Sequence, residues 1–218
     1  MSAASIALVL FDLDGVLCRY DRAARVEHLA ASTGQSVEAV RHAIWGTGLE
    51  SRADAGLVSD TDYLDELRRL LGGRLTLDDW VAARRASMAP DIEVLRLAKA
   101  VSARSRIAIL TNNCRLLATH MARACPEVAA LFGGEIHSTA TYGATKPAPE
   151  AYLGCLQAIG VAPGATLFID DVASNVTGAL LNSWPASPAC SAPVTFDATS
   201  SMNSVAPGAT PIACRQPR

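Results

Sequence analysis

The chain has 218 residues, half of them hydrophobic, which suits one domain or one core with an inserted smaller module. Its formal net charge of −2 and its isoelectric point near 6.1 give no general attraction to nucleic acid or to an anionic membrane. No apolar run is as long as a membrane span, and the opening residues lack the basic start and cleavage site of a signal peptide. These features predict a cytoplasmic protein with neither a nucleic-acid nor a membrane partner.

The six cysteines are scattered and form no CxxC pair, which favours structural thiols in a reducing compartment over disulfides or a zinc site. They are Cys18, Cys114, Cys125, Cys155, Cys190 and Cys214. The histidines show no ligand spacing either, so we expect neither a histidine-based metal site nor a Ser-His-Asp triad. They are His28, His42, His120 and His137.

The first predicted element is a strand over Ile6 to Phe11, an apolar run of the kind that forms a buried parallel strand. Asp12 and Asp14 follow it, and their two-residue spacing on an extended strand end points both side chains to the same side. Open α/β folds bind ligands at the carboxyl edge of the sheet. Carboxylates there are costly unless a metal or a reaction uses them, so both aspartates are candidate functional residues.

Helical spacing follows this strand, with no strand between the helical segments. Thr76 with Asp79 is typical of a helix N-terminal cap. We therefore expect residues 18–87 to form a separate α-helical module, and residues 1–17 and 88–181 to form the core. The apolar sets on one helix face each are Val26, Leu29 and Ala30; Val37, Val40 and Ile44; and Tyr63, Leu64, Leu67 and Leu71.

From residue 88 the pattern alternates between helices and short apolar strands. The helices are predicted over 91–103, 116–124 and 149–159, and the strands over 107–110, 134–138 and 166–169. Strands that alternate with helices predict an α/β fold with a doubly wound, Rossmann-like parallel sheet.

Residues 182–218 differ in character from the rest of the chain. They are rich in Ser, Pro, Ala and Thr, carry one acidic residue, Asp197, and show no convincing periodicity. Two interpretations stay open for this atypical tail. It is disordered, or it is read in a shifted frame from about Ala198 onward, because the alternative frame permits a charged amphipathic helix.

Four motifs occur along the chain in a fixed order. They are Phe11-Asp12-Leu13-Asp14-Gly15-Val16-Leu17, Thr111-Asn112-Asn113, Thr145-Lys146-Pro147 and Phe168-Ile169-Asp170-Asp171. The set resembles the motifs of the haloacid dehalogenase-like hydrolase superfamily in its phosphatase form. The chain has 17 arginines but only two lysines, Lys99 and Lys146, so a lysine at the third motif is hard to attribute to drift.

The resemblance implies a phosphatase that works through an aspartyl-phosphate intermediate. Asp12 would be the nucleophile, and Asp14 would be the general acid and then the general base. Thr111 and Asn112 would hold the phosphoryl group. Lys146 would pair with the nucleophile and with a phosphoryl oxygen, as a compact ammonium can.

The resemblance also implies a Mg²⁺ cofactor. The metal would be held by Asp12, by the backbone carbonyl of Asp14 and by Asp170, with Asp171 in support through water or by orienting Lys146. The cation would reduce the repulsion between the nucleophile and an incoming phosphate. Asp14 argues against the dehalogenase branch of the superfamily, which lacks this second aspartate.

The helical module resembles the α-helical caps of bacterial hexose-phosphate phosphatases and of the phosphatase-like domain of soluble epoxide hydrolases. This implies a small phosphorylated metabolite as substrate, such as a sugar phosphate. Trp45, Glu50 and Arg52 are candidates for facing the substrate, but core packing of Trp45 and surface exposure of the other two are at least as well supported. Two alternatives remain: a phosphomutase of the same fold and a catalytically inactive hydrolase-like binding protein.

Overall fold

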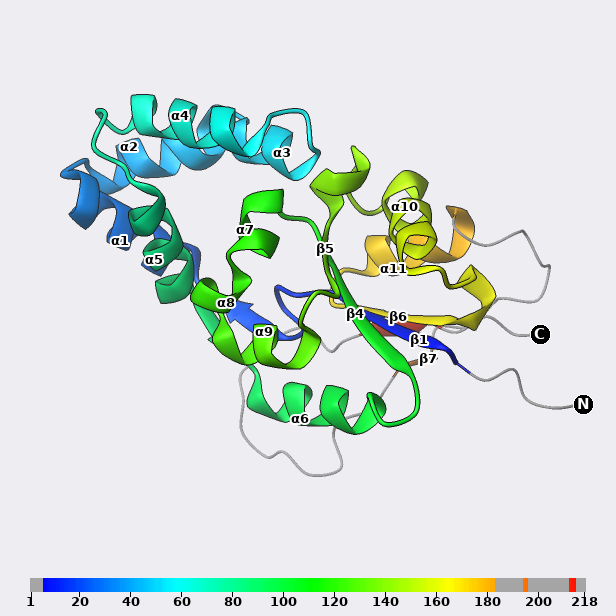
Figure 1. Cartoon of the computed structure of the whole chain (residues 1–218). Helices are drawn as coiled ribbons and strands as arrows, with labels where there is room; N and C mark the ends of the chain where they lie inside the picture. The colour runs from blue at the N-terminus through cyan, green and yellow to red at the C-terminus, as the bar shows by residue number, and fades with distance from the viewer. Residues whose placement is uncertain (1–5, 183–193, 196–211, 215–218) are drawn as a thin grey trace, which may run out of the picture.

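The computed structural model describes residues 6–182, 194–195 and 212–214. Its centre is a sheet with the strand order β5-β4-β1-β6-β8-β7 (Figure 1). The parallel strands are β1 (Leu8–Phe11), β4 (Arg106–Thr111), β5 (Ile136–Ser138) and β6 (Thr166–Asp170). This sheet confirms the predicted α/β fold.

The apolar run of β1 is continuous because both faces of this strand are covered. Val9 and Phe11 belong to one apolar cluster with α6 (Ile92–Val101) and α9 (Pro126–Phe132). Leu8 and Leu10 belong to a second cluster, whose helices are α10 (Pro149–Ile159) and α11 (Ala173–Asn182). Figure 1 shows these two pairs of helices on opposite sides of the sheet. Since each buried aliphatic side chain contributes about 1.5–3 kcal/mol, both faces of β1 hold the core together.

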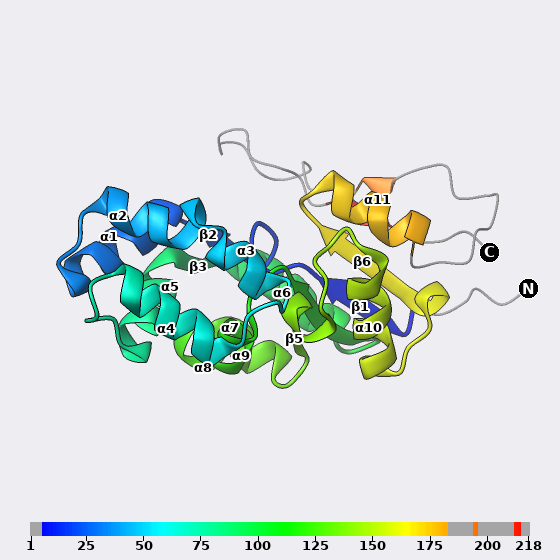
Figure 2. The same ribbon diagram turned by 90° about the horizontal axis from the view of Figure 1, so that it is seen from above.

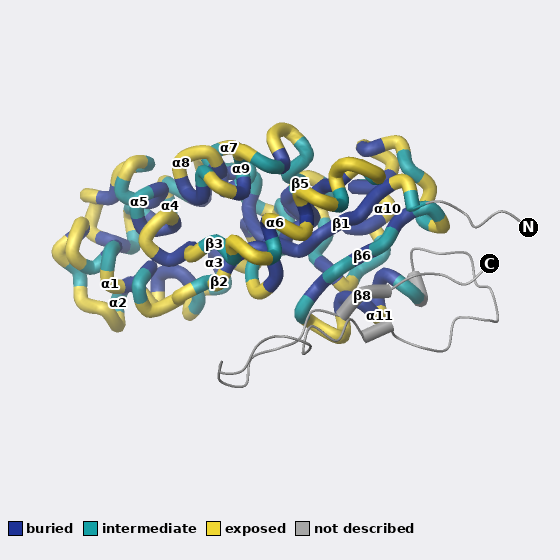
Figure 3. Tube along the Cα trace, turned by 90° about the horizontal axis from the view of Figure 1, so that it is seen from below, coloured by how far each residue is buried: buried dark blue, intermediate teal, exposed yellow. Residues whose placement is uncertain are grey.

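A group of helices lies between β1 and β4 along the chain and stands beside the sheet at one end of the molecule (Figure 2). We call it the helical group. It comprises α1 (Arg22–Thr33), α2 (Val37–Arg41), the π-helix η1 (His42–Gly46), α3 (Leu49–Asp54), α4 (Asp60–Leu70) and α5 (Leu77–Ser87). The first apolar cluster continues from the sheet into this group through Val26, Leu29 and Trp80, and Figure 3 shows buried segments in both parts.

The chain enters and leaves the helical group through a two-stranded antiparallel ribbon. Its strands are β2 (Cys18–Tyr20) and β3 (Met88–Pro90). Neither strand was predicted, because three residues are too few for an alternating pattern to appear in the sequence. The ribbon places both ends of the helical group side by side.

Most helix limits agree with the predicted ones, and one differs for a visible reason. Thr76 and Asp79 form the predicted capping box, because the backbone amide of Asp79 donates to Thr76 Oγ1 and that of Thr76 donates to Asp79 Oδ2. The predicted helix 116–124 is two short helices, α7 (Arg115–Thr119) and α8 (Met121–Ala124). It breaks at His120, whose φ of −105° and ψ of 17° are not helical.

Two short strands extend the sheet beyond β6. β8 (Ile212–Cys214) pairs antiparallel with β6, and β7 (Val194–Thr195) pairs antiparallel with β8. They correct the expectation of a tail without structure at these five positions, and they cover an edge of β6 that would otherwise be open. The rest of residues 183–218, with most of the shifted-frame segment, lies outside the described residues. Within the described part, no helix is long and apolar enough to cross a membrane.

Candidate active site

The four sequence motifs meet at the carboxyl edge of the parallel sheet. Phe11 lies level with Ile109 of β4 and with Ile169 of β6, so the three strands end close together. Asp12 follows β1 directly, and Asp170 is the last residue of β6. Lys146 comes from the loop before α10 and reaches both carboxylates. Strand ends of a parallel sheet thus bring together residues that are up to 158 positions apart in the sequence numbering.

Lys146 is the centre of this cluster. Its ammonium lies 2.8 Å from Asp12 Oδ1 and 2.7 Å from Asp170 Oδ2, and its side chain is fully buried. Burial alone would lower the pKa of Lys146, but the two carboxylates more than offset this and raise it. The side-chain amide of Asn112 holds the backbone of Lys146 in place by accepting from its N–H at 2.8 Å and donating to its carbonyl at 3.0 Å. The ammonium is therefore charged and fixed.

Asp12 has one oxygen in use and one available. Oδ1 accepts hydrogen bonds from Lys146 and, at 2.7 Å, from the backbone N–H of Leu13. No described residue donates a hydrogen bond to Oδ2. Burial raises the pKa of Asp12 to about 7, with Asp170 adding to the rise and Lys146 opposing it. The free oxygen of such a carboxylate can act as a nucleophile.

Asp170 is completely buried and fully hydrogen-bonded. Its Oδ1 accepts from the backbone N–H of Val172 at 2.8 Å, and the side-chain amide of Asn175 lies 3.1 Å from both of its oxygens. Asn175 is held in turn by the hydroxyl of Tyr152, which donates to its carbonyl at 2.7 Å. Asn175 therefore supports the site from α11, although it was not among the predicted site residues.

Three carboxylates at this edge are arranged so that they can hold a metal ion. Asp12, Asp170 and Asp171 each offer an oxygen within 4.8 Å of the others. Asp171 Oδ1 is buried and has no hydrogen-bond partner among the described residues, so it is available as a ligand. A set of hard oxygen donors fits Mg²⁺. The side chain of Asp14 is not in this set, and its predicted contribution through the backbone carbonyl stays a prediction.

Gly15 allows Asp171 to approach the first motif. A Cβ atom at this position would lie 2.2 Å from Asp171 Oδ2, and the φ of Gly15 is +87°. A side chain would be strained by the backbone and would displace the carboxylate. Glycine is therefore required at position 15 for Asp171 to keep its place in the carboxylate cluster.

Asp14 and Thr111 are joined through Asn113. The side-chain amide of Asn113 donates to Asp14 Oδ2 at 3.1 Å and to Thr111 Oγ1 at 2.7 Å. Its carbonyl oxygen accepts from Arg84 at 3.0 Å, and the Arg84 guanidinium lies 4.0 Å from Asp14 Oδ2. Asn113 and Arg84 were not among the predicted site residues. Asn113 could have been found from its place next to the predicted pair Thr111 and Asn112. Nothing in the sequence distinguishes Arg84 from the other 16 arginines.

Glu50 lies inside the helical group, paired with Arg25. The two Arg25 nitrogens bind its two carboxylate oxygens, and the hydroxyl of Tyr63 donates to Glu50 Oε2 at 2.6 Å. Trp45 lies beneath the guanidinium of Arg25, 6.0 Å from it. Two of the three candidates for facing the substrate are therefore engaged inside the helical group. Glu50 is buried and bound to Arg25 and Tyr63, and Trp45 packs against the guanidinium of Arg25.

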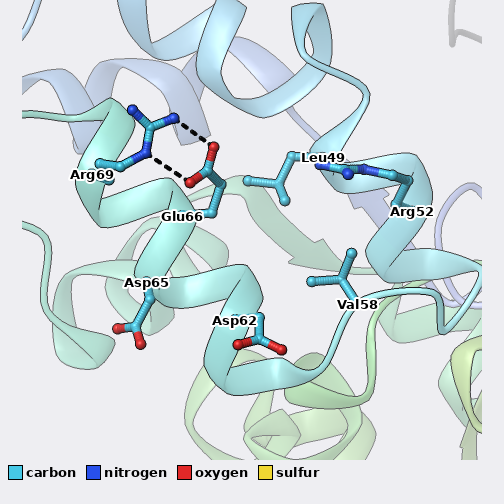
Figure 4. A pocket seen from close by; sticks show the side chains of 7 residues that line it. All are labelled: Leu49, Arg52, Val58, Asp62, Asp65, Glu66 and Arg69. Atoms are coloured by element: carbon cyan, nitrogen blue, oxygen red, sulfur yellow. Dashed lines mark hydrogen bonds and ion pairs between the residues drawn. The ribbon is translucent and has the colours of Figure 1, made fainter.

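Arg52 is exposed and lines a hollow of about 470 Å³ between α3 and α4 (Figure 4). The lining residues are Leu49, Arg52, Val58, Asp62, Asp65, Glu66 and Arg69. Glu66 and Arg69 form an ion pair at 2.7 Å on this surface. None of the carboxylates at the sheet edge belongs to this hollow, so it is separate from the candidate active site.

Asp54, the last residue of α3, links the helical group to a short helix that follows β5. Its backbone carbonyl accepts a hydrogen bond from Thr139 Oγ1 at 3.1 Å, in the 3₁₀-helix η2 (Thr139–Tyr142). Its Oδ1 is buried without a partner among the described residues. Burial raises the pKa of Asp54 to about 8, with Glu50 adding to the rise and Arg84 opposing it.

Comparison with known proteins agrees with this arrangement. A family model for haloacid dehalogenase-like hydrolases matches residues 6–180. Phosphatase MT3486 of Mycobacterium tuberculosis (strain CDC 1551 / Oshkosh) is 30% identical over 182 residues, which cover 80% of this chain and 83% of that protein.

Solved structures share the fold at lower identity. HAD family enzyme BT-2542 from Bacteroides thetaiotaomicron, in complex with magnesium and inorganic phosphate, is 21% identical with a TM-score of 0.67, over 82% of this chain and 91% of that one. A predicted HAD-like family hydrolase from Porphyromonas gingivalis is 24% identical with a TM-score of 0.66, over 83% and 89%. The L-2-haloacid dehalogenase of Xanthobacter autotrophicus is 22% identical with a TM-score of 0.54, over 80% and 74%. The chain belongs to the haloacid dehalogenase-like hydrolase family.

Proposed function

We propose that this protein is a Mg²⁺-dependent phosphatase that hydrolyses a small phosphomonoester through an aspartyl-phosphate on Asp12. The observation that carries the proposal is the state of the Asp12 carboxylate. One of its oxygens is fixed by Lys146, the other accepts no hydrogen bond from the described residues, and the carboxylate lies beside those of Asp170 and Asp171. The name of the phosphatase relative and the magnesium and phosphate of the Bacteroides structure support the same chemistry.

Two half-reactions account for hydrolysis with the residues present. Asp12 Oδ2 forms a bond to phosphorus, the ester P–O bond breaks, and the leaving oxygen takes its electron pair and a proton from Asp14. Asp14, now a carboxylate, takes a proton from water. The water oxygen then bonds to phosphorus as the bond between Asp12 and phosphorus breaks, which releases inorganic phosphate and restores both aspartates.

The remaining residues of the site balance the charge of the phosphoryl group and hold it in place. Lys146 faces the nucleophile and a phosphoryl oxygen, and Thr111 with Asn112 holds the phosphoryl group through a hydroxyl and a backbone amide. Asp12, Asp170 and the carbonyl of Asp14 would hold Mg²⁺, with Asp171 in support. When bound, the cation neutralises negative charge shared by the carboxylates and the phosphate.

We further propose that residues 18–87 act as a cap over a core made of residues 1–17 and 88–181, and that the substrate is a sugar phosphate. Support for the cap comes from Arg84, which reaches Asn113 from this group, and support for a sugar phosphate comes from the resemblance of these helices to the caps of hexose-phosphate phosphatases. The buried free thiols of Cys18, Cys114, Cys125 and Cys155 suit a reducing, cytoplasmic location.

Phosphate release from a panel of sugar phosphates and other phosphomonoesters tests the proposal, with Mg²⁺ and with a chelator. We expect metal-dependent release that Asp12→Asn abolishes and that Asp65→Asn, a change at an exposed aspartate of α4, leaves intact. Interconversion of sugar phosphates without phosphate release would identify a phosphomutase instead. A folded wild type without either activity would identify a catalytically inactive binding protein.

A further inference from the structure

Arg84 is a buried cation that faces the candidate active site from the helical group. It lies on α5, its side chain is 2% exposed, and its guanidinium covers the ring of Tyr20 at 4.8 Å. Among the described residues, its one hydrogen bond goes to Asn113 Oδ1, and Asp14 Oδ2 lies 4.0 Å away. A buried guanidinium is costly unless charge or acceptors compensate it. The two groups within hydrogen-bond or ion-pair distance, Asn113 and Asp14, lie outside the helical group, and Glu50 and Asp54 inside it add a longer-range attraction.

This contact fixes which way the Asn113 amide points. A guanidinium can only donate hydrogen bonds, so the amide oxygen must face Arg84. The amide nitrogen then faces Asp14 Oδ2 and the hydroxyl of Thr111, at 3.1 Å and 2.7 Å. The flipped amide would place donor against donor at Arg84 and acceptor against acceptor at Asp14, which disfavours it at both ends.

The carboxyl group of Asp14 is thereby held from both sides. Oδ2 accepts from Asn113, and Oδ1 lies 3.5 Å from the thiol of Cys18. The backbone carbonyl of Asn113 accepts a hydrogen bond from Ser138 Oγ, so the residue that carries the amide is itself anchored. Asp14 is the more exposed of the two first-motif aspartates, and without these contacts nothing described would fix its rotamer.

We propose that Arg84 is a positioning residue for leaving-group protonation, acting through Asn113 on Asp14 and Thr111. The inference rests on the proposed function, in which Asp14 is the general acid. Proton transfer to the leaving group then depends on a residue of the helical group, because Arg84 lies on α5 and reaches Asn113 from there. When the general acid is misplaced, the rate falls most for substrates whose leaving group most needs a proton.

The test compares two substrates of the same shape. The phenolate of p-nitrophenyl phosphate is a good leaving group with little need for a proton, whereas phenyl phosphate needs protonation more. We expect Arg84→Met to lower kcat/KM, which reports the half-reaction that expels the leaving group, by about tenfold more for phenyl phosphate than for p-nitrophenyl phosphate. Arg84→Lys, which can still donate to Asn113, should restore part of the loss.

The control is Arg85→Met. Arg85 is the exposed neighbour on the same helix, and it donates to the carbonyl of Arg123 rather than to the site. It should leave both substrates unchanged. An equal loss of kcat/KM on the two substrates in Arg84→Met would show a purely structural role and overturn the inference.

Asn113→Ala provides a second route if Arg84→Met fails to fold. It should show the same substrate-selective loss, and the partial loss caused by Arg84→Lys should disappear in the Asn113→Ala background, because that loss also passes through Asn113. An additive double variant would overturn the inference. A crystal structure of Arg84→Lys or Arg84→Met gives an independent readout: the Asn113 amide keeps its contact to Asp14 in the lysine variant and loses it in the methionine variant.

Failure of the inference can be told from failure of the proposed function. If Asp12→Asn still releases phosphate, the proposed function is wrong whatever Arg84 does. If Asp12→Asn is inactive and Asp14→Asn shows the substrate-selective loss but Arg84→Met does not, the proposed function stands and only the role of Arg84 is wrong.

Discussion

The ion pair between Arg25 and Glu50 should be essential to the stability of the helical group. Arg25 on α1 is completely inaccessible, and Glu50 on α3 is nearly so. The pair joins helices that are separated by α2 and η1 in the sequence. The Tyr63 hydroxyl donates to Glu50 and accepts from Trp80 Nε1 at 3.2 Å, which extends the network to α4 and α5.

The magnitude follows from burial. Arg25→Met would leave the Glu50 carboxylate in the interior with the Tyr63 hydroxyl alone, and breaking a buried pair in this way costs about 3–5 kcal/mol. Glu50→Gln keeps an oxygen that can accept from Arg25, so about 1–3 kcal/mol is expected. The double variant with Arg25→Met and Glu50→Leu removes both charges. Its loss of unfolding free energy should be smaller than the sum of the losses from Arg25→Met alone and Glu50→Leu alone, by at least about 2 kcal/mol.

The dependence on pH has a definite sign. Burial raises the pKa of Glu50, but Arg25 more than offsets this, so the folded pKa lies below 4.5. The pair therefore contributes stability above about pH 4.5 and loses it as the pH falls through the folded pKa. Without Arg25, only Arg84 and the Tyr63 hydroxyl oppose the effect of burial on Glu50, and Arg25→Met should gain stability relative to wild type as the pH falls.

Urea unfolding followed by Trp fluorescence and by circular dichroism measures these differences. Arg22→Met is the matched control, because Arg22 is exposed on the same helix and interacts only with the ring of Trp45 among the described residues. It should cost about 1 kcal/mol or less. The reasoning would be refuted if Arg25→Met cost no more than Arg22→Met, or if the double variant were strictly additive.

Three further changes probe the site and its surroundings. Lys146→Met should lower phosphate release by about 10²-fold or more, because it removes the cation beside the nucleophile, while Lys99→Met at an exposed position should not; equal rates in both would contradict the role of Lys146. Gly56→Ala should destabilise the protein more than Gly34→Ala, as measured by thermal unfolding. Both glycines have positive φ, but a Cβ at Gly56 would lie 2.2 Å from a carbonyl oxygen of η2, whereas none lies within 4 Å at Gly34. Asp54, with a pKa of about 8 when folded against 3.8 ordinarily, should make wild type lose stability as the pH rises from about 4 to 8, by at most about 6 kcal/mol. Asp54→Asn should flatten this slope, and an unchanged slope in urea unfolding would show that Asp54 is not its source.

The residues at the strand ends could be placed from the sequence because the physics there is local. The run before Asp12 is apolar at every position, which two covered faces require, and a parallel strand delivers its last residues to the ligand-binding edge. Once β1, β4 and β6 are recognised, Asp12, Thr111 and Asp170 must lie near one another. Lys146 could be predicted as a site residue because lysine occurs only twice in this chain.

The contacts that cross between separate parts of the chain could not be read in this way. Arg84 looks like any helical arginine until α5 is placed beside Asn113, and Glu50 looks like a surface residue until α1 brings Arg25 to it. β2 and β3 are too short to show a period, since each gains its pairing only from the other. The break at His120 depends on backbone angles that no pattern of apolar residues encodes.

The central claim is that Asp12 becomes covalently phosphorylated during turnover. Wild type mixed with substrate and Mg²⁺, quenched in acid on the timescale of one turnover and digested, can be analysed by mass spectrometry for the peptide that contains Asp12. The account predicts one added phosphoryl group on Asp12, absent in Asp12→Asn and accumulating in a variant that cannot activate water, Asp14→Asn, with p-nitrophenyl phosphate as substrate. Multiple-turnover phosphate release without any phosphorylated Asp12, in wild type and in Asp14→Asn alike, would contradict it.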